Sequence, residues 1–192
     1  MASPRYIVAG IDTEVGKTVV SALLVRALRA DYWKPIQCGL PRDSEAIERI
    51  CRIECHKETY CLKTPCSPHL AAKKEGVHIA AKDLIPPKCT RPLVIEGTGG
   101  ILAPLNDREV WFDAAKTWDA KWILVHRHYL GSLNHFLLTL SFLQTHTIPL
   151  AGVVFNGEGD PETEKMLLKK AKTSCLGRIP WHPSFGIPSH KP

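Results

Sequence analysis

The sequence predicts an α/β protein with a mainly parallel sheet and helices on both of its faces. Short apolar runs alternate along the chain with segments of helical periodicity, an alternation typical of βαβ units. No repeat, low-complexity tract or linker divides the 192 residues, a length that suits one domain with a substantial core. We therefore expect a single three-layer domain over residues 1–192.

In the first half of the chain, the apolar run Tyr6–Ala9 predicts a strand that stops at Gly10. Thr18–Ala30 is expected to be a helix because its apolar residues recur three and four positions apart. Tyr32–Ile36 is a second apolar run and predicts the next strand. Asp43–Ile53 places its apolar residues on one face and predicts the next helix.

The second half continues the alternation after a loop rich in Pro, Thr and Ser. Its expected elements are, in order, a short helix at Leu70–Glu75, strands at Pro92–Ile95 and Trp122–Val125, a long helix at Ser132–Thr145, a strand at Ala151–Phe155, a helix at Glu162–Lys172 and a strand at Leu176–Pro180. Ligands of such sheets bind beyond the carboxyl ends of the strands. Gly10, Glu96 and Asn156 are all expected at that edge.

The formal net charge is +6 and the sequence pI is near 9.0, which raises the question of nucleic-acid binding. The basic residues are scattered, and their small clusters lack the interleaved aromatic residues that a base-stacking groove needs. We interpret them as solvated helix faces that also attract anionic substrates. The prediction is that the protein binds no nucleic acid.

Seven cysteines are present, an odd number with irregular spacing, which argues against a disulfide framework. Four of them, together with His56 and His69, raise the possibility of zinc, but they form no paired CxxC units. Free thiols in a cytosol are the preferred interpretation. No apolar run approaches the ~20 residues of a membrane helix, and the first residues lack a signal-peptide core. We expect a cytoplasmic protein that does not bind a membrane.

The segment Gly10–Thr18 joins the first strand to the first helix and has the composition of a phosphate-binding loop. Backbone N–H groups and the positive end of a helix hold phosphate oxygens in such loops. Gly16 allows close approach of the backbone, Lys17 reaches the β- and γ-phosphates, and the Thr18 hydroxyl ligates Mg²⁺. Five residues separate the two glycines, where the usual pattern has four. The loop predicts binding of a nucleoside triphosphate with magnesium.

Charged residues near this loop are candidates for the chemistry. Glu96 ends a buried strand, the placement of a second-strand acid that holds Mg²⁺. Asp43 and Glu45 open a helix, where an acid serves equally as a dipole partner or as a metal ligand. Lys34 lies at the end of an apolar strand, just before Pro35, and its position alone does not separate a role on a transferring phosphoryl group from that of a surface lysine.

Taken together, the motifs resemble those of the dethiobiotin synthetase family. The matching segments occur in the family's order along nearly the whole chain: Thr13–Thr18, Trp33–Gln37, Ser67–His69, Glu96–Gly100, Pro104–Asp107, Leu130–His135, Asn156 and Gly177–Trp181. The loop with five intervening residues is the family's own form. The resemblance implies a three-layer, P-loop NTPase-like fold.

The resemblance also implies an activity, the ATP-dependent carboxylation of 7,8-diaminononanoate. In the family, CO₂ adds to one amine to give a carbamate, ATP phosphorylates the carbamate, and the second amine closes a cyclic urea. The products are dethiobiotin, ADP and phosphate, and the reaction belongs to biotin biosynthesis. ATP is the co-substrate and Mg²⁺ the cofactor.

Residue roles follow from the matching motifs. Lys34 is expected to be the catalytic lysine between carbamate and γ-phosphate. Magnesium would be held by Thr18, Glu96 and Glu45, with Asp43 as the alternative to Glu45. The residues expected to bind ATP are Glu14, Val15, Gly16, Lys17, Thr18, Val19, Glu45, Glu96, Gly97, Thr98, Gly99, Asn156, Pro180, Trp181 and His182. Those expected to bind the diamine are Thr13, Cys38, Gly131 and Ser132.

In the family, the helix start that corresponds to Gly131–Ser132 comes from the second subunit, so the resemblance implies a homodimer. Free N–H groups there would bind the substrate carboxylate, although Ser132 could also be a simple N-cap. The sequence departs from the family pattern at Cys38, where other members have Ser, and at Glu45, where an Asp is expected.

Two other functions are open to a chain with this loop. One is a nucleotide-dependent switch related to the partition and cell-division ATPases, but these carry an additional lysine early in the loop, and Gly10–Asp12 contains none. The other is an inactive relative, which would be expected to lose Lys17, Lys34 or Glu96. All three are present, and the enzyme is the favoured interpretation.

Overall fold

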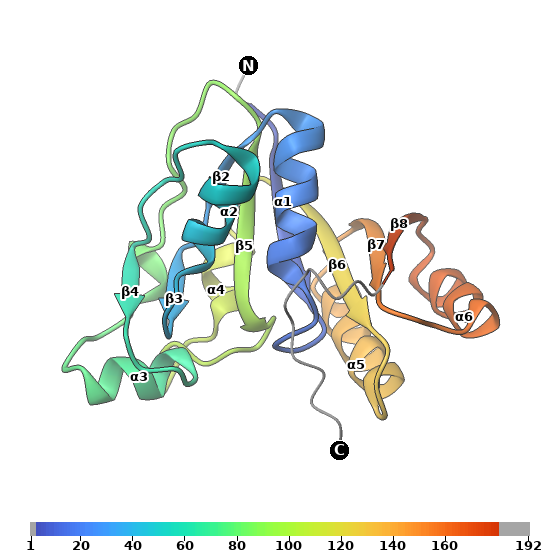
Figure 1. The fold of residues 1–192 in the computed structure, drawn as a ribbon. Helices are drawn as coiled ribbons and strands as arrows, with labels where there is room; N and C mark the ends of the chain where they lie inside the picture. Colours follow the sequence, from blue (N-terminus) through green and yellow to red (C-terminus); the bar gives the residue numbers. More distant parts are fainter. Residues whose placement is uncertain (1–2, 181–192) are drawn as a thin grey trace.

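A computed structural model describes residues 3–180 and places a six-stranded, fully parallel sheet at the centre of the protein (Figure 1). The strand order is β2-β5-β1-β6-β7-β8. The strands are β1 (Arg5–Gly10), β2 (Asp31–Trp33), β5 (Leu93–Gly100), β6 (Lys121–Arg127), β7 (Leu150–Asn156) and β8 (Cys175–Ile179). The predicted parallel α/β fold is confirmed.

Helices cover both faces of this sheet. On one face α1 packs against β1 and β5 and also against α2, whereas on the other face α4 and α5 meet through the rings of Phe112 and Phe142, 4.9 Å apart. The helices are α1 (Lys17–Leu28), α2 (Asp43–Cys51), α3 (Pro68–Lys74), the 3₁₀ turn η1 (Ala81–Asp83), α4 (Trp111–Ala115), α5 (Ser132–Thr145) and α6 (Pro161–Ala171). No helix in this part of the chain is both long and apolar enough to cross a bilayer.

One predicted strand was wrong in a way that matters for function. Tyr32–Ile36 is not one strand, because β2 ends at Trp33 and β3 begins at Ile36 in a different, two-stranded sheet with β4 (Tyr60–Leu62). Pro35 lies at the break, and a proline cannot donate a backbone hydrogen bond to a central ladder. The break leaves Lys34 between the two sheets and not within a strand.

A second difference concerns β5, which is longer than the predicted Pro92–Ile95. Glu96 does not end the strand, since the strand continues to Gly100 and Glu96 pairs in register with Val8 of β1. Glycine carries no side chain that would reveal a buried strand in the sequence, so the run of apolar residues stops too early. The other expected elements are present within a few residues of their predicted limits, and Ser132–Thr145 agrees at both ends.

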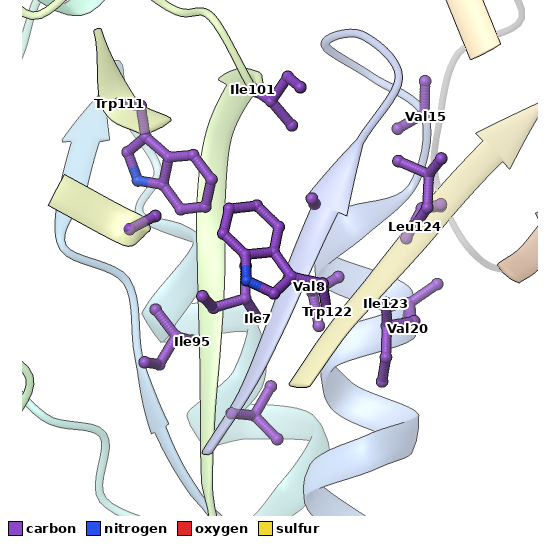
Figure 2. Packing of buried hydrophobic residues seen from close by; sticks show 14 of the residues in the cluster. Ile7, Val8, Val15, Val20, Ile95, Ile101, Trp111, Trp122, Ile123 and Leu124 are labelled. Carbon is purple, nitrogen blue, oxygen red and sulfur yellow. The ribbon is translucent and has the colours of Figure 1, made fainter. Parts of the chain in front are cut away.

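The core lies on both faces of the central strands (Figure 2). The ring of Trp122 in β6 lies 5.7 Å from that of Trp111 in α4, and Trp111 lies 6.1 Å from Trp118, which in turn lies 5.5 Å from Trp33. These aromatic contacts join the second helical layer to the sheet and to the segment before Lys34. None of the seven cysteines forms a disulfide bond.

His126 is the buried polar residue with the clearest consequence for stability. Its ring is fully buried in β6, within 5.5 Å of the ring of Phe136, and neither ring nitrogen has a hydrogen-bond partner among residues 3–180. Burial, aided by the neighbouring His128, lowers the pKa of His126 to about 4. The ring is therefore neutral in the folded protein near pH 7.

We expect acid to destabilise the protein partly through this residue. Between the unfolded pKa of about 6.5 and the folded value, the unfolded chain binds a proton that the folded protein does not, so stability falls as the pH falls through this window. When the pH is lowered from 7 to 4.5, the free energy of unfolding of the His126→Phe variant should fall by about 2 kcal/mol less than that of wild type, as measured by urea unfolding. Equal losses in the two proteins would contradict this role.

Candidate active site

The phosphate loop runs from the end of β1 to the start of α1, and its backbone conformation depends on Gly16. Gly16 has φ +93°, and a Cβ at this position would lie 2.2 Å from Nδ2 of Asn156. Asn156, the last residue of β7, donates from Nδ2 to the carbonyl oxygen of Val15 at 2.9 Å. Only glycine combines this backbone conformation with such close packing. The contact places Asn156 directly beside the loop.

Lys17 is the first residue of α1, and its side chain folds back over the loop. Its Nζ donates to the backbone oxygen of Asp12 at 3.0 Å, and the residue is only 7% exposed. Burial, together with the nearby charge of Lys34, lowers the pKa of Lys17 to about 8. An anion bound in the loop would replace the carbonyl contact and favour the charged ammonium.

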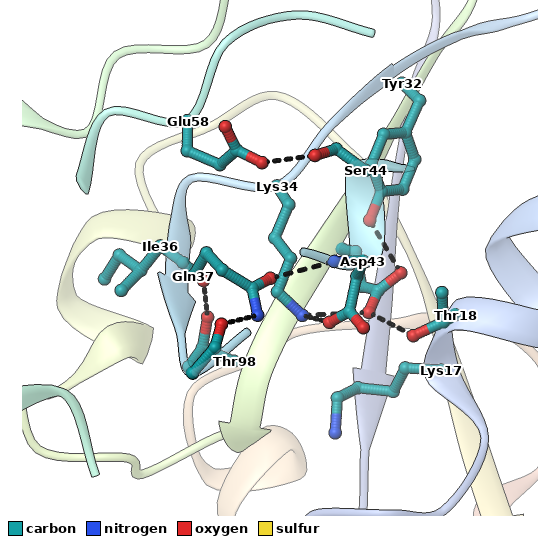
Figure 3. Close-up of polar contacts among 12 residues, drawn as sticks. Lys17, Thr18, Tyr32, Lys34, Ile36, Gln37, Asp43, Ser44, Glu58 and Thr98 are labelled. Atoms are coloured by element: carbon teal, nitrogen blue, oxygen red, sulfur yellow. Dashed lines mark hydrogen bonds and ion pairs between the residues drawn. The ribbon is translucent and has the colours of Figure 1, made fainter. Parts of the chain in front are cut away.

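Three charged side chains meet beside this loop (Figure 3). The Lys34 ammonium contacts Oδ2 of Asp43 and donates to Oε1 of Glu96 at 3.1 Å. The same Glu96 oxygen accepts a hydrogen bond from the Thr18 hydroxyl at 2.9 Å. Lys34, Asp43, Glu96 and Thr18 come from four separate segments of the chain, and the fold brings them together at the carboxyl edge of the sheet.

Lys34 and Glu96 are almost completely removed from solvent, whereas the Asp43 side chain is 34% exposed. Lys34 is 6% exposed and Glu96 is 1% exposed. Burial opposes the charge on Lys34, but Glu96 and Asp43 outweigh it and raise the pKa of the ammonium to about 12. Burial likewise disfavours the Glu96 carboxylate, but the Lys34 charge prevails and lowers its pKa. Both groups are therefore ionised at neutral pH, which makes the cluster a fixed electrostatic environment.

The surrounding hydrogen bonds hold these groups in position. Tyr32 in β2 donates from its hydroxyl to Oε2 of Glu96 at 2.9 Å. Gln37 in β3 accepts at Oε1 from the backbone N–H of Asp43, the first residue of α2. Ser44, the next residue of α2, donates to the buried Glu58. The start of α2, and with it Asp43, is thus fixed from both sides.

The structure distinguishes the two acids that the sequence left open. The Asp43 carboxylate contacts Lys34 beside Glu96 and Thr18, whereas the Glu45 side chain is 48% exposed and pairs with Arg42 at 2.8 Å. Hydroxyl and carboxylate oxygens are the donors that Mg²⁺ prefers. Thr18, Asp43 and Glu96 therefore form a donor set that fits magnesium, and the geometry favours Asp43 over Glu45.

The remaining predicted ATP residues lie around the loop and β5. Thr98 donates from its hydroxyl to the backbone oxygen of Ile36 at 2.7 Å, which ties β5 to β3. A Cβ on Gly97 would lie 3.2 Å from the ring of Trp111. Glu14 is exposed, Val15 is buried, Val19 is partly buried, Gly99 has φ +60° and Pro180 is exposed beyond β8. Trp181 and His182 lie outside the described residues.

The predicted diamine residues are more dispersed. Thr13 is exposed at the tip of the loop. Cys38 is the last residue of β3 and its thiol is partly buried. Burial, together with the nearby Cys66, raises the pKa of this thiol to about 11. Cys38 is thus a neutral thiol near pH 7. Gly131 and Ser132 begin α5, where the Ser132 hydroxyl accepts a hydrogen bond from the N–H of Tyr129 at 3.3 Å. No contact among residues 3–180 links this helix start to Lys34.

Two tyrosines near the site were not identified from the sequence. Tyr32 was assigned only to a strand, although its position two residues before Lys34 was a usable signal. Tyr129 links the phosphate loop to α5, since its hydroxyl donates to Oδ2 of Asp12 at 3.2 Å and lies 2.7 Å from Nδ1 of His135. Nothing in the local sequence pattern connects Tyr129 with residues more than a hundred positions away.

Comparison with known proteins shows which proteins this chain is similar to. A family described as AAA domain matches residues 4–189. The ATP-dependent dethiobiotin synthetase BioD of Agrobacterium fabrum (strain C58) is 44% identical over 188 residues, which cover 95% of this chain and 89% of that protein. The chain belongs to the dethiobiotin synthetase family. The protein of the same name from Christiangramia forsetii is 42% identical, over 94% of this chain and 89% of that protein. The one from Brucella ovis is 43% identical, over 92% of this chain and 85% of that protein.

Solved structures of other proteins share the fold of this dethiobiotin synthetase family member. A ParA family ATPase from Chlorobium tepidum superposes with a TM-score of 0.57 at 12% identity, covering 95% of this chain and 86% of that one. A putative plasmid partition protein from Borrelia burgdorferi gives the same TM-score at 14% identity, covering 100% of this chain and 93% of that one. At this identity the likeness concerns the fold alone, and it supports the three-layer P-loop architecture.

Proposed function

We propose that this protein catalyses the ATP-dependent carboxylation and ring closure of 7,8-diaminononanoate with CO₂ to give dethiobiotin, ADP and phosphate. The observation that carries the proposal furthest is the buried, protonated Lys34 between two carboxylates, directly beside a phosphate loop. Membership in the dethiobiotin synthetase family supports the same reaction. The match over residues 4–189 also supports a single domain over 1–192.

The reaction joins three steps. One amine of the diamine attacks CO₂ and loses a proton, which gives a carbamate. A carbamate oxygen then attacks the γ-phosphorus of ATP, the bond to ADP breaks, and a mixed carbamic–phosphoric anhydride forms. The second amine attacks the carbonyl carbon, expels phosphate and loses a proton, which closes the cyclic urea of dethiobiotin.

Lys34 and Lys17 serve the second step electrostatically. Negative charge gathers where the carbamate approaches the γ-phosphate, and a fixed ammonium lowers the free energy of that arrangement without reorganisation. The pKa of about 12 keeps Lys34 charged throughout the working pH range. Lys17 would hold the β- and γ-phosphates together with the loop N–H groups.

Thr18, Glu96 and Asp43 would hold magnesium with the triphosphate. When bound, the ion would neutralise phosphate charge and help to orient the γ-phosphoryl group. These residues also position Lys34, since both carboxylates contact its ammonium. Glu45 is the alternative ligand, although its pairing with Arg42 speaks against it.

Asn156 is proposed to bind the adenine base through hydrogen bonds. Its amide can both donate to and accept from the edge of a base, and its bond to the Val15 oxygen places it next to the loop. The other residues of the proposed nucleotide site are Glu14, Val15, Gly16, Val19, Gly97, Thr98, Gly99, Pro180, Trp181 and His182.

The diamine would lie between Lys34 and the exposed Thr13, with Cys38 nearby. Its carboxylate is proposed to bind at Gly131–Ser132 of a second subunit, so the protein would act as a homodimer. Exposed apolar side chains near and along α5, namely Leu130, Leu133 and Leu138, support an interface there. A groove of about 260 Å³ between α5 and residues 100–103 lies beside Leu138. The mass of the protein in solution tests this proposal directly.

The activity itself is tested by measuring phosphate release from ATP with Mg²⁺, bicarbonate and the diamine, together with mass-spectrometric detection of dethiobiotin. We expect phosphate and dethiobiotin in equal amounts, and no phosphate release when the diamine is omitted. Steady ATP hydrolysis that is independent of the diamine would instead indicate a nucleotide-dependent switch.

A further inference from the structure

Three metal-binding side chains lie together at the end of the sheet opposite the active site. Asp31 is the first residue of β2, Cys89 lies in the irregular segment before β5, and His56 follows α2. One ligand atom from each lies within 4.8 Å of the other two. Along the chain His56 lies near Cys51, Cys55 and Cys61, whereas the fold places it beside Asp31 and Cys89.

The backbone fixes the positions of two of these residues. The N–H of Asp31 donates to the oxygen of Pro92 at 2.8 Å, within the parallel pairing of β2 and β5. The N–H of His56 donates to the oxygen of Tyr32 at 2.9 Å, and His56 forms an isolated parallel bridge with Trp33. Asp31 and His56 are therefore held on adjacent backbone segments, and the cluster does not depend on flexible side chains alone.

The donor atoms converge on a single ring nitrogen. Sγ of Cys89 lies 3.3 Å from Nε2 of His56, and Oδ2 of Asp31 lies 3.9 Å from the same nitrogen. A Cys–His–Asp catalytic relay uses both ring nitrogens, one toward the thiol and one toward the carboxylate. With both partners at Nε2, the ring cannot pass a proton from one to the other, so the arrangement does not fit nucleophilic catalysis.

Three ligand atoms that lie within 4.8 Å of one another can instead surround one metal ion. In a tetrahedral zinc site, ligand atoms at bond lengths of 2.0–2.3 Å lie roughly 3.3–3.8 Å apart. The two separations from Nε2 of His56, 3.3 Å and 3.9 Å, are close to this range. A thiolate, an imidazole and a carboxylate together suit Zn²⁺ better than Mg²⁺, which prefers oxygen ligands alone. Arg91 contacts Oδ1 of Asp31 and leaves Oδ2 directed at His56, as an outer partner of a ligating carboxylate does.

We propose that Asp31, His56 and Cys89 bind a zinc ion, with water as the fourth ligand. The ion would join three segments at the amino ends of the strands and anchor residues 84–92, which contain no helix or strand. Asp31 and Lys34 are three positions apart in the sequence, about 10 Å of extended chain. The proposed zinc site is therefore separate from the magnesium site.

The test is a titration of chelator-treated protein with Zn²⁺ and with Co²⁺, in excess Mg²⁺ so that oxygen-only sites are filled. We expect one equivalent of zinc, and with Co²⁺ a thiolate charge-transfer absorption together with tetrahedral ligand-field bands. Cys89→Ser should abolish the charge-transfer band, and His56→Ala should weaken Zn²⁺ binding by more than about 100-fold, beyond the loss typical of an outer-shell change. Zn²⁺ should raise Tm in wild type but not in Cys89→Ser or His56→Ala.

Cys61→Ser is the matched control, because Cys61 is an exposed cysteine in β4. The Cys61→Ser variant should keep both the thiolate charge-transfer band and the wild-type affinity for Zn²⁺. Diamine-dependent turnover in the Cys89 and His56 variants should equal that of wild type, which shows that they are folded. The absence of a thiolate band in wild type, or its persistence in Cys89→Ser, would overturn the proposal whatever the enzymatic activity.

Discussion

Replacing Lys34 with alanine is expected to lower kcat for diamine-dependent turnover by about 100- to 1,000-fold, the usual cost of removing one preorganised electrostatic group. The ammonium is buried and charged, and no other side chain among residues 3–180 forms an ion pair with the Asp43 or Glu96 carboxylate. ATP should still bind within a few-fold of wild type, because Lys17 and the loop N–H groups remain. Steady-state kinetics and isothermal titration with a non-hydrolysable ATP analogue measure the two quantities.

Two further variants separate a catalytic effect from a loss of folding. Lys34→Ala leaves the Asp43 and Glu96 carboxylates without their shared partner, so circular dichroism and a thermal melt with Mg²⁺ must show an intact fold. Lys34→Arg keeps the charge and should retain more activity than Lys34→Ala. Lys165→Ala removes an exposed lysine of α6 and should have no effect. Near-normal turnover in folded Lys34→Ala would refute the proposed role.

Glu96→Gln is expected to raise the Mg²⁺ concentration needed for half-maximal activity and to reduce kcat/KM by about 100-fold. The substitution keeps the shape of a side chain that accepts hydrogen bonds from Thr18, Tyr32 and Lys34, but it removes the charge that these donors surround. We also expect a loss of about 1–3 kcal/mol in stability, because hydrogen bonds to a charged acceptor become neutral ones. A Mg²⁺ titration of activity and urea unfolding provide the measurements.

The same titration decides between the two acids of α2. Asp43→Asn should raise the Mg²⁺ requirement as Glu96→Gln does, whereas Glu45→Gln, which removes an exposed partner of Arg42, should leave it unchanged and cost less than about 1 kcal/mol in stability. If only Glu45→Gln raised the Mg²⁺ concentration needed for half-maximal activity, Glu45 and not Asp43 would be the ligand.

Much of the fold could be predicted from the sequence because its elements carry strong local signals. The phosphate loop, the long helix α5 and the buried strands show patterns that depend only on neighbouring residues. The predictions failed where a local signal was weak or misleading. Pro35 interrupts an apolar run that otherwise resembles one strand, and the glycines after Glu96 conceal the second half of β5.

The sequence by itself determined the residue types of the site: a lysine at the loop, a lysine after the second strand and acids nearby, each tied to a short motif. Only the tertiary structure decided which of them meet. Asp43, not Glu45, lies beside Lys34 and Glu96, and His56 lies beside Asp31 and Cys89. The physical reason is that local sequence governs helix faces and strand limits, whereas contacts between residues tens of positions apart depend on strand order and register, which the packing of the whole chain sets.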